Sequence, residues 1–344
     1  MSSFKLTERK QKILHAIITD YIQTAEPVGS RTISRRYKMN LSAATIRNEM
    51  ADLEEMGYLS QPHTSAGRIP SQIGYRFYVD YLMNLGEISQ QEDQYISHFF
   101  LQLEKMREID QIIQHTAKIL SYLTNYTSIV LGPQFGRSAF KQLRLIPLDG
   151  CKALVVLITD TGIIKNNVVD LPQALSSEEQ TRVVRYINEH LAGHTIESLT
   201  ASQIQEMRSA LYAKIDILEQ ALLLLDESGS EHGNRIFLGG TSNILNQPEF
   251  KDLEKVKRLL SLFEQDERMV LLLETSMEGL AIKIGTENSL QEMNDCSLVT
   301  ATYLLHSRPV GTIGVMGPTR MEYSRVVKII EYISHKLNDI LEAI

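Results

Sequence analysis

Residues 30–70, SRTISRRYKMNLSAATIRNEMADLEEMGYLSQPHTSAGRIP, constrain the fold more than any other stretch of the chain. They contain two short helical segments separated by a polar turn, followed by a loop that carries a glycine and a cation. The first segment predicts a helix over 31–37 with Ser30 as its N-cap, because a serine hydroxyl accepts a free backbone N–H. A turn over 38–41 follows. Helix, turn and helix in this order are typical of proteins that place the second helix in a DNA major groove.

The second helix should begin after its cap, Ser42, and end at Gly57, where a left-handed C-cap favours glycine. Its apolar residues recur at i, i+4 and i+7 and form one stripe: Ile46, Met50 and Leu53. The opposite face begins with small or hydrogen-bonding residues, which permit close approach to base edges, and Arg and Asn bind guanine and adenine through paired hydrogen bonds. We therefore expect contacts with bases and phosphates from six residues of the two helices: Arg31, Thr32, Ser42, Thr45, Arg47 and Asn48.

The segment after the second helix predicts a wing. Residues 58–60 can pair as a strand, and the polar loop that follows supplies three candidate phosphate contacts: His63, Ser65 and Arg68. Apolar residues at helical spacing over 7–24 predict one more helix before the recognition unit. Three helices and a wing make a winged-helix domain, and the alternative is an ordinary helical hairpin with a surface loop.

Charge is distributed unevenly along the chain. The first 82 residues carry eleven cationic and eight anionic side chains, so this part is +3 and the remainder is −10 within a total of −7. A mildly basic N-terminal part attached to an acidic remainder fits one nucleic-acid-binding module on domains that DNA repels.

The rest of the chain predicts an α+β multidomain protein, since 344 residues exceed one compact core. We expect a helix over 71–83, whose tyrosines are core residues or stack on bases, a linker over 84–91, and one long amphipathic helix to about residue 126. Strands are predicted at 128–131, 143–147, 153–159, 163–169, 269–274, 280–284, 297–305 and 312–316, and a last helix at 321–341. A mostly helical insert with helices at 176–191, 202–225 and 250–263 and a strand at 235–238 separates the two strand groups.

Other candidate sites are weaker. His190 and His194 have an i, i+4 spacing that can bind a metal, but they fit a helix end better, and we expect no metal or cofactor. The glycines of 239–243 and 311–317 lack the lysine of a phosphate-binding loop and are predicted to lie in turns. Cys151 has no histidine partner in view, and no nucleophile, base and orienting residue occur together, so we do not expect an enzyme.

No apolar run of the sequence reaches the length of a membrane span, and the first residues lack the pattern of a secretory signal. Together with only two cysteines, this favours a cytoplasmic protein without a membrane partner.

The runs PVGSRTISRRY, LSAATIRNEMADLEEMGYLSQPHTSAGRIPSQIGYRFYVDYL and GPTRMEYSRVVKIIEYIS resemble the HrcA family of heat-inducible transcription repressors over essentially the whole chain. The resemblance implies a winged helix at 1–88, a GAF-like domain at 89–174 and 269–344, and a dimerisation domain inserted at 175–268. It also implies a homodimeric repressor of chaperone operons of the groE and dnaK type, which binds the inverted repeat CIRCE on double-stranded DNA and is assisted by the chaperonin GroEL.

Three questions stay open. The dimer interface could use an apolar series at 4, 3, 4 spacing (Leu211, Ile215, Leu218 and Leu222), or these residues could face the core of the insert itself. The GAF-like body could instead bind a metabolite in a one-component regulator, which a stabilising small molecule in a thermal-shift screen would reveal. An enzyme that uses the glycine-rich turns is a third, weaker reading.

Overall fold

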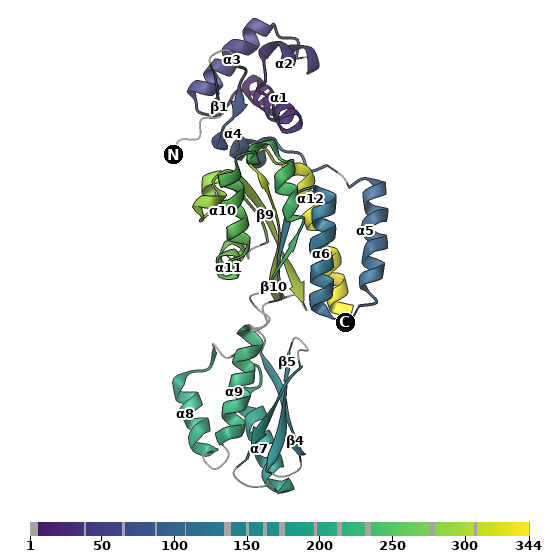
Figure 1. Cartoon of the computed structure of the whole chain (residues 1–344), viewed down its shortest axis with the longest axis vertical. Helices are drawn as coiled ribbons and strands as arrows, with labels where there is room; N and C mark the ends of the chain where they lie inside the picture. The colour runs from purple at the N-terminus through teal and green to yellow at the C-terminus, as the bar shows by residue number, and fades with distance from the viewer. Residues whose placement is uncertain are drawn as a thin grey trace. The chain divides into compact units, whose positions relative to one another are not determined.

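A computed structural model describes residues 6–37, 39–63, 66–86, 88–106, 108–133, 139–148, 151–160, 164–171, 176–195, 198–211, 215–230, 235–274, 279–305 and 308–343. The chain divides into two compact units (Figure 1). The first comprises Met1–Val130, Leu238–Thr302 and Thr312–Ile344, and the second comprises Leu131–Phe237 and Tyr303–Gly311. Each unit is an α+β arrangement.

The first unit begins with a part that we call the head, residues 6–70. It consists of α1 (Glu8–Thr24), α2 (Ser30–Arg36), α3 (Ala43–Glu55) and a hairpin of β1 (Leu59–Ser60) and β2 (Ile69–Pro70). Its core is aliphatic and fully shielded from solvent, and includes Ile13, Leu14, Ile17, Ile33, Ile46 and Leu53. The predicted helices are confirmed, but the predicted N-cap of α2 is wrong by one residue. Gly29 is the N-cap, and Ser30 is already helical and buried.

A connector follows the head. It consists of α4 (Gln72–Phe77) and a π-helical turn, η1 (Tyr78–Leu82), with Ser71 as the N-cap that accepts from the Gly74 N–H at 3.1 Å. An added Cβ at Gly74 would lie 2.2 Å from the Tyr58 carbonyl oxygen, so the connector and the hairpin fit together only with glycine here.

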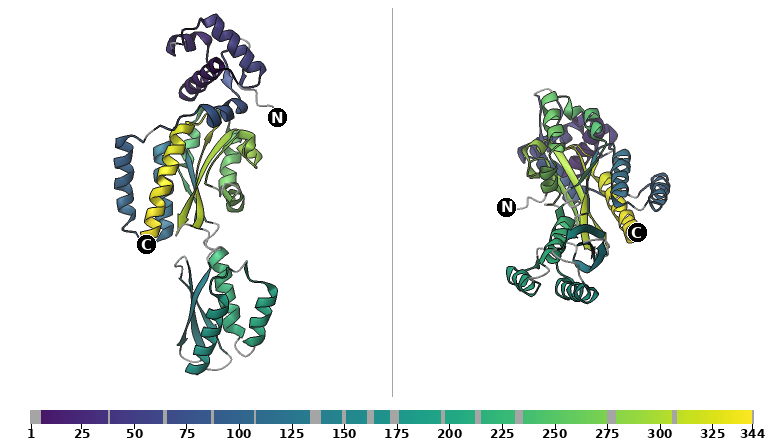
Figure 2. Two further views of the ribbon diagram at one scale, coloured as in Figure 1. Left: turned by 180° about the vertical axis from the view of Figure 1, so that it is seen from behind. Right: turned by 60° about the horizontal axis from the view of Figure 1, so that its bottom comes forward.

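The remainder of the first unit, which we call the body, is built on one sheet. Its strand order is β7 (Ile236–Gly239), β3 (Thr127–Leu131), β10 (Arg308–Pro318), β9 (Cys296–Leu305) and β8 (Leu280–Ile284). Helices α6 (Ile109–Thr124) and α12 (Tyr323–Ala343) cover one face, and α10 (Leu253–Phe263) and α11 (Asp266–Glu274) lie on the other (Figures 1 and 2). Helix α5 (Gln90–Leu103) lies against α6 and α12. Short 3-10 turns complete it: η5 (Thr241–Asn246), η6 (Pro248–Phe250), η7 (Gly285–Glu287) and η8 (Gln291–Met293).

The second unit has its own antiparallel sheet in the order β4 (Phe140–Leu148), β5 (Lys152–Thr159), β6 (Ile164–Asp170). Helices α7 (Ser177–Leu191) and α9 (Ile215–Ser230) pack on one face of this sheet, and α8 (Ala201–Ala210) lies against α9. The inward side chains of the strands, such as Leu143, Val155 and Leu157, are fully buried with those of the helices.

Four sequence predictions about these elements are wrong. The single long helix before residue 126 is two helices, α5 and α6, because α5 ends at Leu103 and the chain folds back. The predicted helix 202–225 is likewise divided into α8 and α9. The predicted strand 269–274 is helix α11, whose short apolar run fits either structure. The glycines of 311–317 lie within strand β10 and not in a turn.

The expected domain boundary at 174/175 also differs from the structure. Strands β4, β5 and β6 were assigned to the first part of a GAF-like domain, but they pair only with one another and belong to the second unit. Helix α10, which was expected in the insert, belongs to the first unit. Sequence periodicity identified the strands but contained no information on which strands share a sheet.

Candidate nucleic-acid interface

Helix α3 is held at both ends by the residues that the sequence pointed to. The Ser42 hydroxyl accepts a 3.1 Å hydrogen bond from the Thr45 N–H and lies 2.9 Å from the Thr45 hydroxyl. At the other end Gly57 has φ +82°, and the N–H groups of Gly57 and Tyr58 donate to the carbonyls of Glu54 and Leu53, both at 2.9 Å. This double hydrogen bond is a Schellman stop, so α3 ends where the hairpin begins.

The two faces of α3 are divided as predicted. Ile46, Met50 and Leu53 are buried, and α3 packs against α1. Arg47 and Asn48 are exposed on the opposite side. On α2, Arg31 and Thr32 are also exposed. The turn between the two helices contains Asn40, whose φ of 52° is left-handed, and α2 packs against α3.

Most cations of the head are neutralised by carboxylates. Lys10 lies 2.7 Å from Glu49 and 2.8 Å from Asp52, which ties α1 to the later turns of α3. Lys12 pairs with Glu8 at 2.7 Å. Arg36 pairs with Asp20, a carboxylate whose side chain is only 5% exposed. Arg9 pairs with Glu49 at 3.3 Å.

Within the described part of the head, three cations have no acidic partner: Arg31, Arg35 and Arg47. All three lie on α2 or in the first two turns of α3. The described cations without a carboxylate partner therefore all lie on the two helices where the sequence predicted DNA contacts. Arg35 was missed by the sequence reasoning, although its i, i+4 spacing from Arg31 places both on one face of α2 and could have identified it.

The hairpin gives Arg68 a role that the sequence did not reveal. Its Nη2 lies 2.7 Å from Glu54 Oε2 on α3, and its side chain is 19% exposed. Its N–H and carbonyl form two 2.9 Å hydrogen bonds with Val28. Next to it, an added Cβ at Gly67 would lie 2.4 Å from the Val28 carbonyl oxygen. The base of the hairpin is thus hydrogen-bonded to the segment before α2, whereas His63 is exposed and Ser65 lies outside the described residues.

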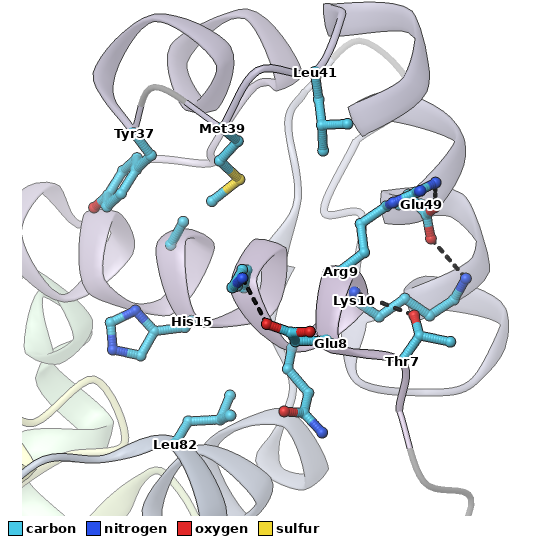
Figure 3. A pocket seen from close by; sticks show the side chains of 13 residues that line it. Thr7, Glu8, Arg9, Lys10, His15, Tyr37, Met39, Leu41, Glu49 and Leu82 are labelled. Carbon is cyan, nitrogen blue, oxygen red and sulfur yellow. Dashed lines mark hydrogen bonds and ion pairs between the residues drawn. The ribbon is translucent and has the colours of Figure 1, made fainter.

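A hollow of about 1130 Å³ lies on another side of the head, along the first half of α1 (Figure 3). Tyr37, Met39, Leu41 and Leu82 supply apolar surface to it. Its charged lining is paired, and burial lowers the pKa of His15 at its edge below the ordinary value. None of the described residues predicted to contact DNA lines this hollow.

The other candidate sites have structural partners. A ring nitrogen of His190 lies 2.9 Å from the Tyr186 carbonyl, and one of His194 lies 3.3 Å from the Ser198 hydroxyl. Where the chain is described, there is no cluster of three or more His, Cys, Asp or Glu side chains that could hold a metal. Gly311 packs against the Tyr303 ring, where an added Cβ would lie 2.4 Å from the ring. Burial raises the pKa of the Cys296 thiol to about 12, and Cys151 is exposed.

The four residues proposed for a dimer seam fall into the second unit. Leu211, Leu218 and Leu222 are 8%, 0% and 8% exposed and belong to the core between α9 and the sheet. These three side chains therefore pack inside the second unit, in a core that they share with β4, β5 and β6. Ile215 begins α9, and its side chain lies outside the described residues. No described helix is both long and apolar enough to cross a membrane.

Comparison with known proteins gives a consistent result. The family described as "HrcA protein C terminal domain" matches residues 110–327. A protein of Natranaerobius thermophilus named heat-inducible transcription repressor HrcA is 50% identical over 98% of this chain and 97% of its own. One of the same name from Pelotomaculum thermopropionicum is 46% identical over 99% and 98%. A crystal structure described as a hypothetical protein at 2.2 Å resolution has the same fold, with a TM-score of 0.60, 23% identity and coverage of 98% and 99%.

Proposed function

Because the chain belongs to the HrcA family of heat-inducible transcription repressors, we propose that it binds a specific inverted repeat upstream of chaperone operons and blocks their transcription. The operator is a CIRCE-type element, and the operons are of the groE and dnaK type. In this proposal the head is a winged helix, the body is GAF-like, and the second unit serves dimerisation. The protein is a cytoplasmic regulator of transcription and carries out no catalysis.

The observation that supports DNA binding best is the position of the unpaired arginines. An arginine without a carboxylate partner can bind a phosphate or a guanine without first breaking an ion pair. Arg47, together with Asn48, lies at the start of α3, where small neighbours permit entry into the groove. Arg31 and Arg35 lie on α2, which in helix-turn-helix proteins crosses the DNA backbone. We assign base contacts to Arg47 and Asn48 and backbone contacts to Arg31, Thr32 and Arg35.

An inverted repeat requires two heads related by a two-fold axis. The second unit offers a surface for this, because strand β5 is apolar on both sides. Its inward residues are buried, while Leu154, Val156 and Ile158 form the middle of an outer face. The register places exposed apolar neighbours beside them, with exposed fractions of 48%, 47% and 62%: Ile146, Val168 and Ile164.

We propose that a second copy of the chain covers this outer face of β4, β5 and β6. A strand that is apolar on both faces is typical of a sheet buried on both sides. Val156→Glu should convert the dimer to a monomer in size-exclusion chromatography with light scattering. The matched control is Leu245→Glu, which changes a 64% exposed apolar residue of η5 in the body. A Val156→Glu variant that stays dimeric would exclude this surface.

Heat and chaperonin would act on the same dimer. Two weakly charged heads hold the operator tightly only when each binds its half-site. Partial unfolding of one protomer therefore removes most of the affinity of the dimer for the operator. Unfolding rates rise about 3–6-fold per 10 °C, which makes the loss steep. We propose that GroEL restores the folded dimer. After heating, operator binding should recover with GroEL and ATP and stay low without them, and equal recovery in both samples would contradict this step.

The direct test of function is fluorescence anisotropy with a CIRCE-type duplex and with a scrambled duplex of the same composition. Specific binding predicts an affinity for the repeat about 10³-fold or more above that for the scrambled duplex at physiological salt. The variant Arg47→Ala should reduce this ratio. Equal affinity of the wild-type protein for both duplexes would refute the proposal.

A further inference from the structure

One arginine of the body reaches the first helix of the head. Arg320, between β10 and α12, donates a 2.6 Å hydrogen bond from Nη1 to the Ile22 carbonyl oxygen of α1. Its Nε and Nη2 donate to the two carboxylate oxygens of Glu249 in η6, at 2.6 and 3.3 Å. The side chain is only 11% exposed. A single guanidinium thus joins the head to two segments of the body.

The contact with Ile22 brings a hydrogen-bond donor and a positive charge to the last turn of α1. Carbonyls in the last turn of a helix have no partner within the helix, and they carry the negative end of its dipole. The last turn of α1 contains no basic residue of its own. Arg320 therefore provides both the missing donor and the favourable charge. Burial alone would lower the pKa of Arg320, but the hydrogen bond and charge of Glu249 raise it above its ordinary value, so the guanidinium stays charged.

A second arginine fixes the connector to the same body. Arg76 of α4 donates a 2.9 Å hydrogen bond from Nε to Glu287, and its Nη2 also donates to the Ile282 carbonyl at 2.7 Å. The Thr286 hydroxyl and the Gln72 side chain add a 2.8 Å hydrogen bond beside it. The head is therefore attached through α1 by Arg320 and through the connector by Arg76.

We propose that Arg320 is a positioning residue for operator binding, which holds each head on its body so that the two heads of a dimer keep the separation and rotation of the two half-sites. The inference depends on the proposed binding of an inverted repeat by a dimer. Arg320 touches no DNA in this proposal. Its effect is on the geometry between heads, and each head alone reads its half-site without it.

The test uses operators in which the distance between the half-sites changes. Each added base pair rotates one half-site by roughly 35° relative to the other, so a rigidly held pair of heads tolerates little change. For the wild-type protein, insertion of two base pairs should lower the affinity about tenfold or more. For Arg320→Met the ratio of the affinity for the normal operator to the affinity for the lengthened operator should fall towards one. The affinity for a single half-site should stay unchanged. Arg320→Lys, which keeps the charge without the fork, should lie between them.

The matched control is Arg268→Met. Arg268 also binds a carboxylate, since its Nη2 donates to both oxygens of Glu292 at 3.0 Å, but this pair lies wholly within the body. The affinity of Arg268→Met should depend on the distance between the half-sites as that of the wild-type protein does, even if the variant has a lower melting temperature. An Arg320→Met profile identical to the wild-type profile, with intact half-site binding, would overturn the inference. Failure of the wild-type protein to bind any repeat would instead overturn the proposed function.

Discussion

Arg68 provides the sharpest test in the head, because the sequence and the structure suggest different roles for its side chain. From the sequence it is a phosphate contact of the wing. In the structure its guanidinium is 2.7 Å from Glu54 Oε2, and its main chain is bonded to Val28. A phosphate contact would require the ion pair with Glu54 to open. We expect that Arg68 mainly stabilises the junction between α3 and the hairpin.

The partial burial of the Arg68–Glu54 ion pair determines how much free energy Arg68→Ala should cost. A hydrogen bond between charged groups contributes about 1.5–3 kcal/mol when shielded, and an exposed ion pair contributes about 0.2–1 kcal/mol. The two side chains are 19% and 33% exposed. We therefore expect Arg68→Ala to lower the local free energy of opening by about 1 kcal/mol, since the main-chain bonds to Val28 remain. This corresponds to an opening equilibrium about fivefold larger.

Hydrogen exchange of α3 and β1 amides in the full chain measures this opening, because a multidomain protein has no single two-state unfolding transition. Arg68→Ala and Glu54→Ala should each accelerate exchange about fivefold, and the double variant should add little to either. The dependence of DNA affinity on salt should keep its slope. Unchanged exchange in Arg68→Ala, together with a salt slope lower by about 0.9, the value for one lost phosphate contact, would make Arg68 a phosphate contact instead.

Three further predictions concern the interface and the thiols. Arg47→Ala should cost about 1–3 kcal/mol in operator affinity and relax specificity at one base pair, measured by anisotropy on a set of single-base operator variants. Arg35→Ala should instead weaken binding to all of these operators alike. A uniform loss in Arg47→Ala would show that Arg47 contacts the DNA backbone. Ser42→Ala removes the cap of α3 and should destabilise its first turn by about 1 kcal/mol in hydrogen exchange, and an unchanged first turn would show that the hydroxyl is dispensable. Cys151 should react with a thiol reagent in the native protein and Cys296 only after unfolding, because burial raises the pKa of Cys296 to about 12; labelling of both at equal rates in native protein would contradict this.

The head could be predicted closely from the sequence because its signals are local. A cap such as Ser42, a glycine stop such as Gly57 and an apolar stripe on α3 each act within one or two helical turns. The candidate interface was predicted less completely. Its local charge depends on which cations are already paired, and the pairs Lys10–Glu49 and Arg68–Glu54 join residues far apart in sequence. Those pairs distinguish Arg35 from the neutralised cations, whereas its i, i+4 spacing from Arg31 was already visible in the sequence.

The second unit shows why the assembly surface could not be chosen from periodicity. Leu218 and Leu222 have the spacing of a seam between helices, but a helix that packs on a sheet needs the same spacing, and these side chains of α9 are buried in that way. The more informative signal was in strand β5, whose run ALVVLIT does not alternate with polar residues. A strand with one face towards water should alternate, so an apolar outer face means that something else must cover it. Among the described residues of the second unit, helices cover only one face of the sheet, and we propose that a second copy covers the other, as an inverted-repeat operator would also require.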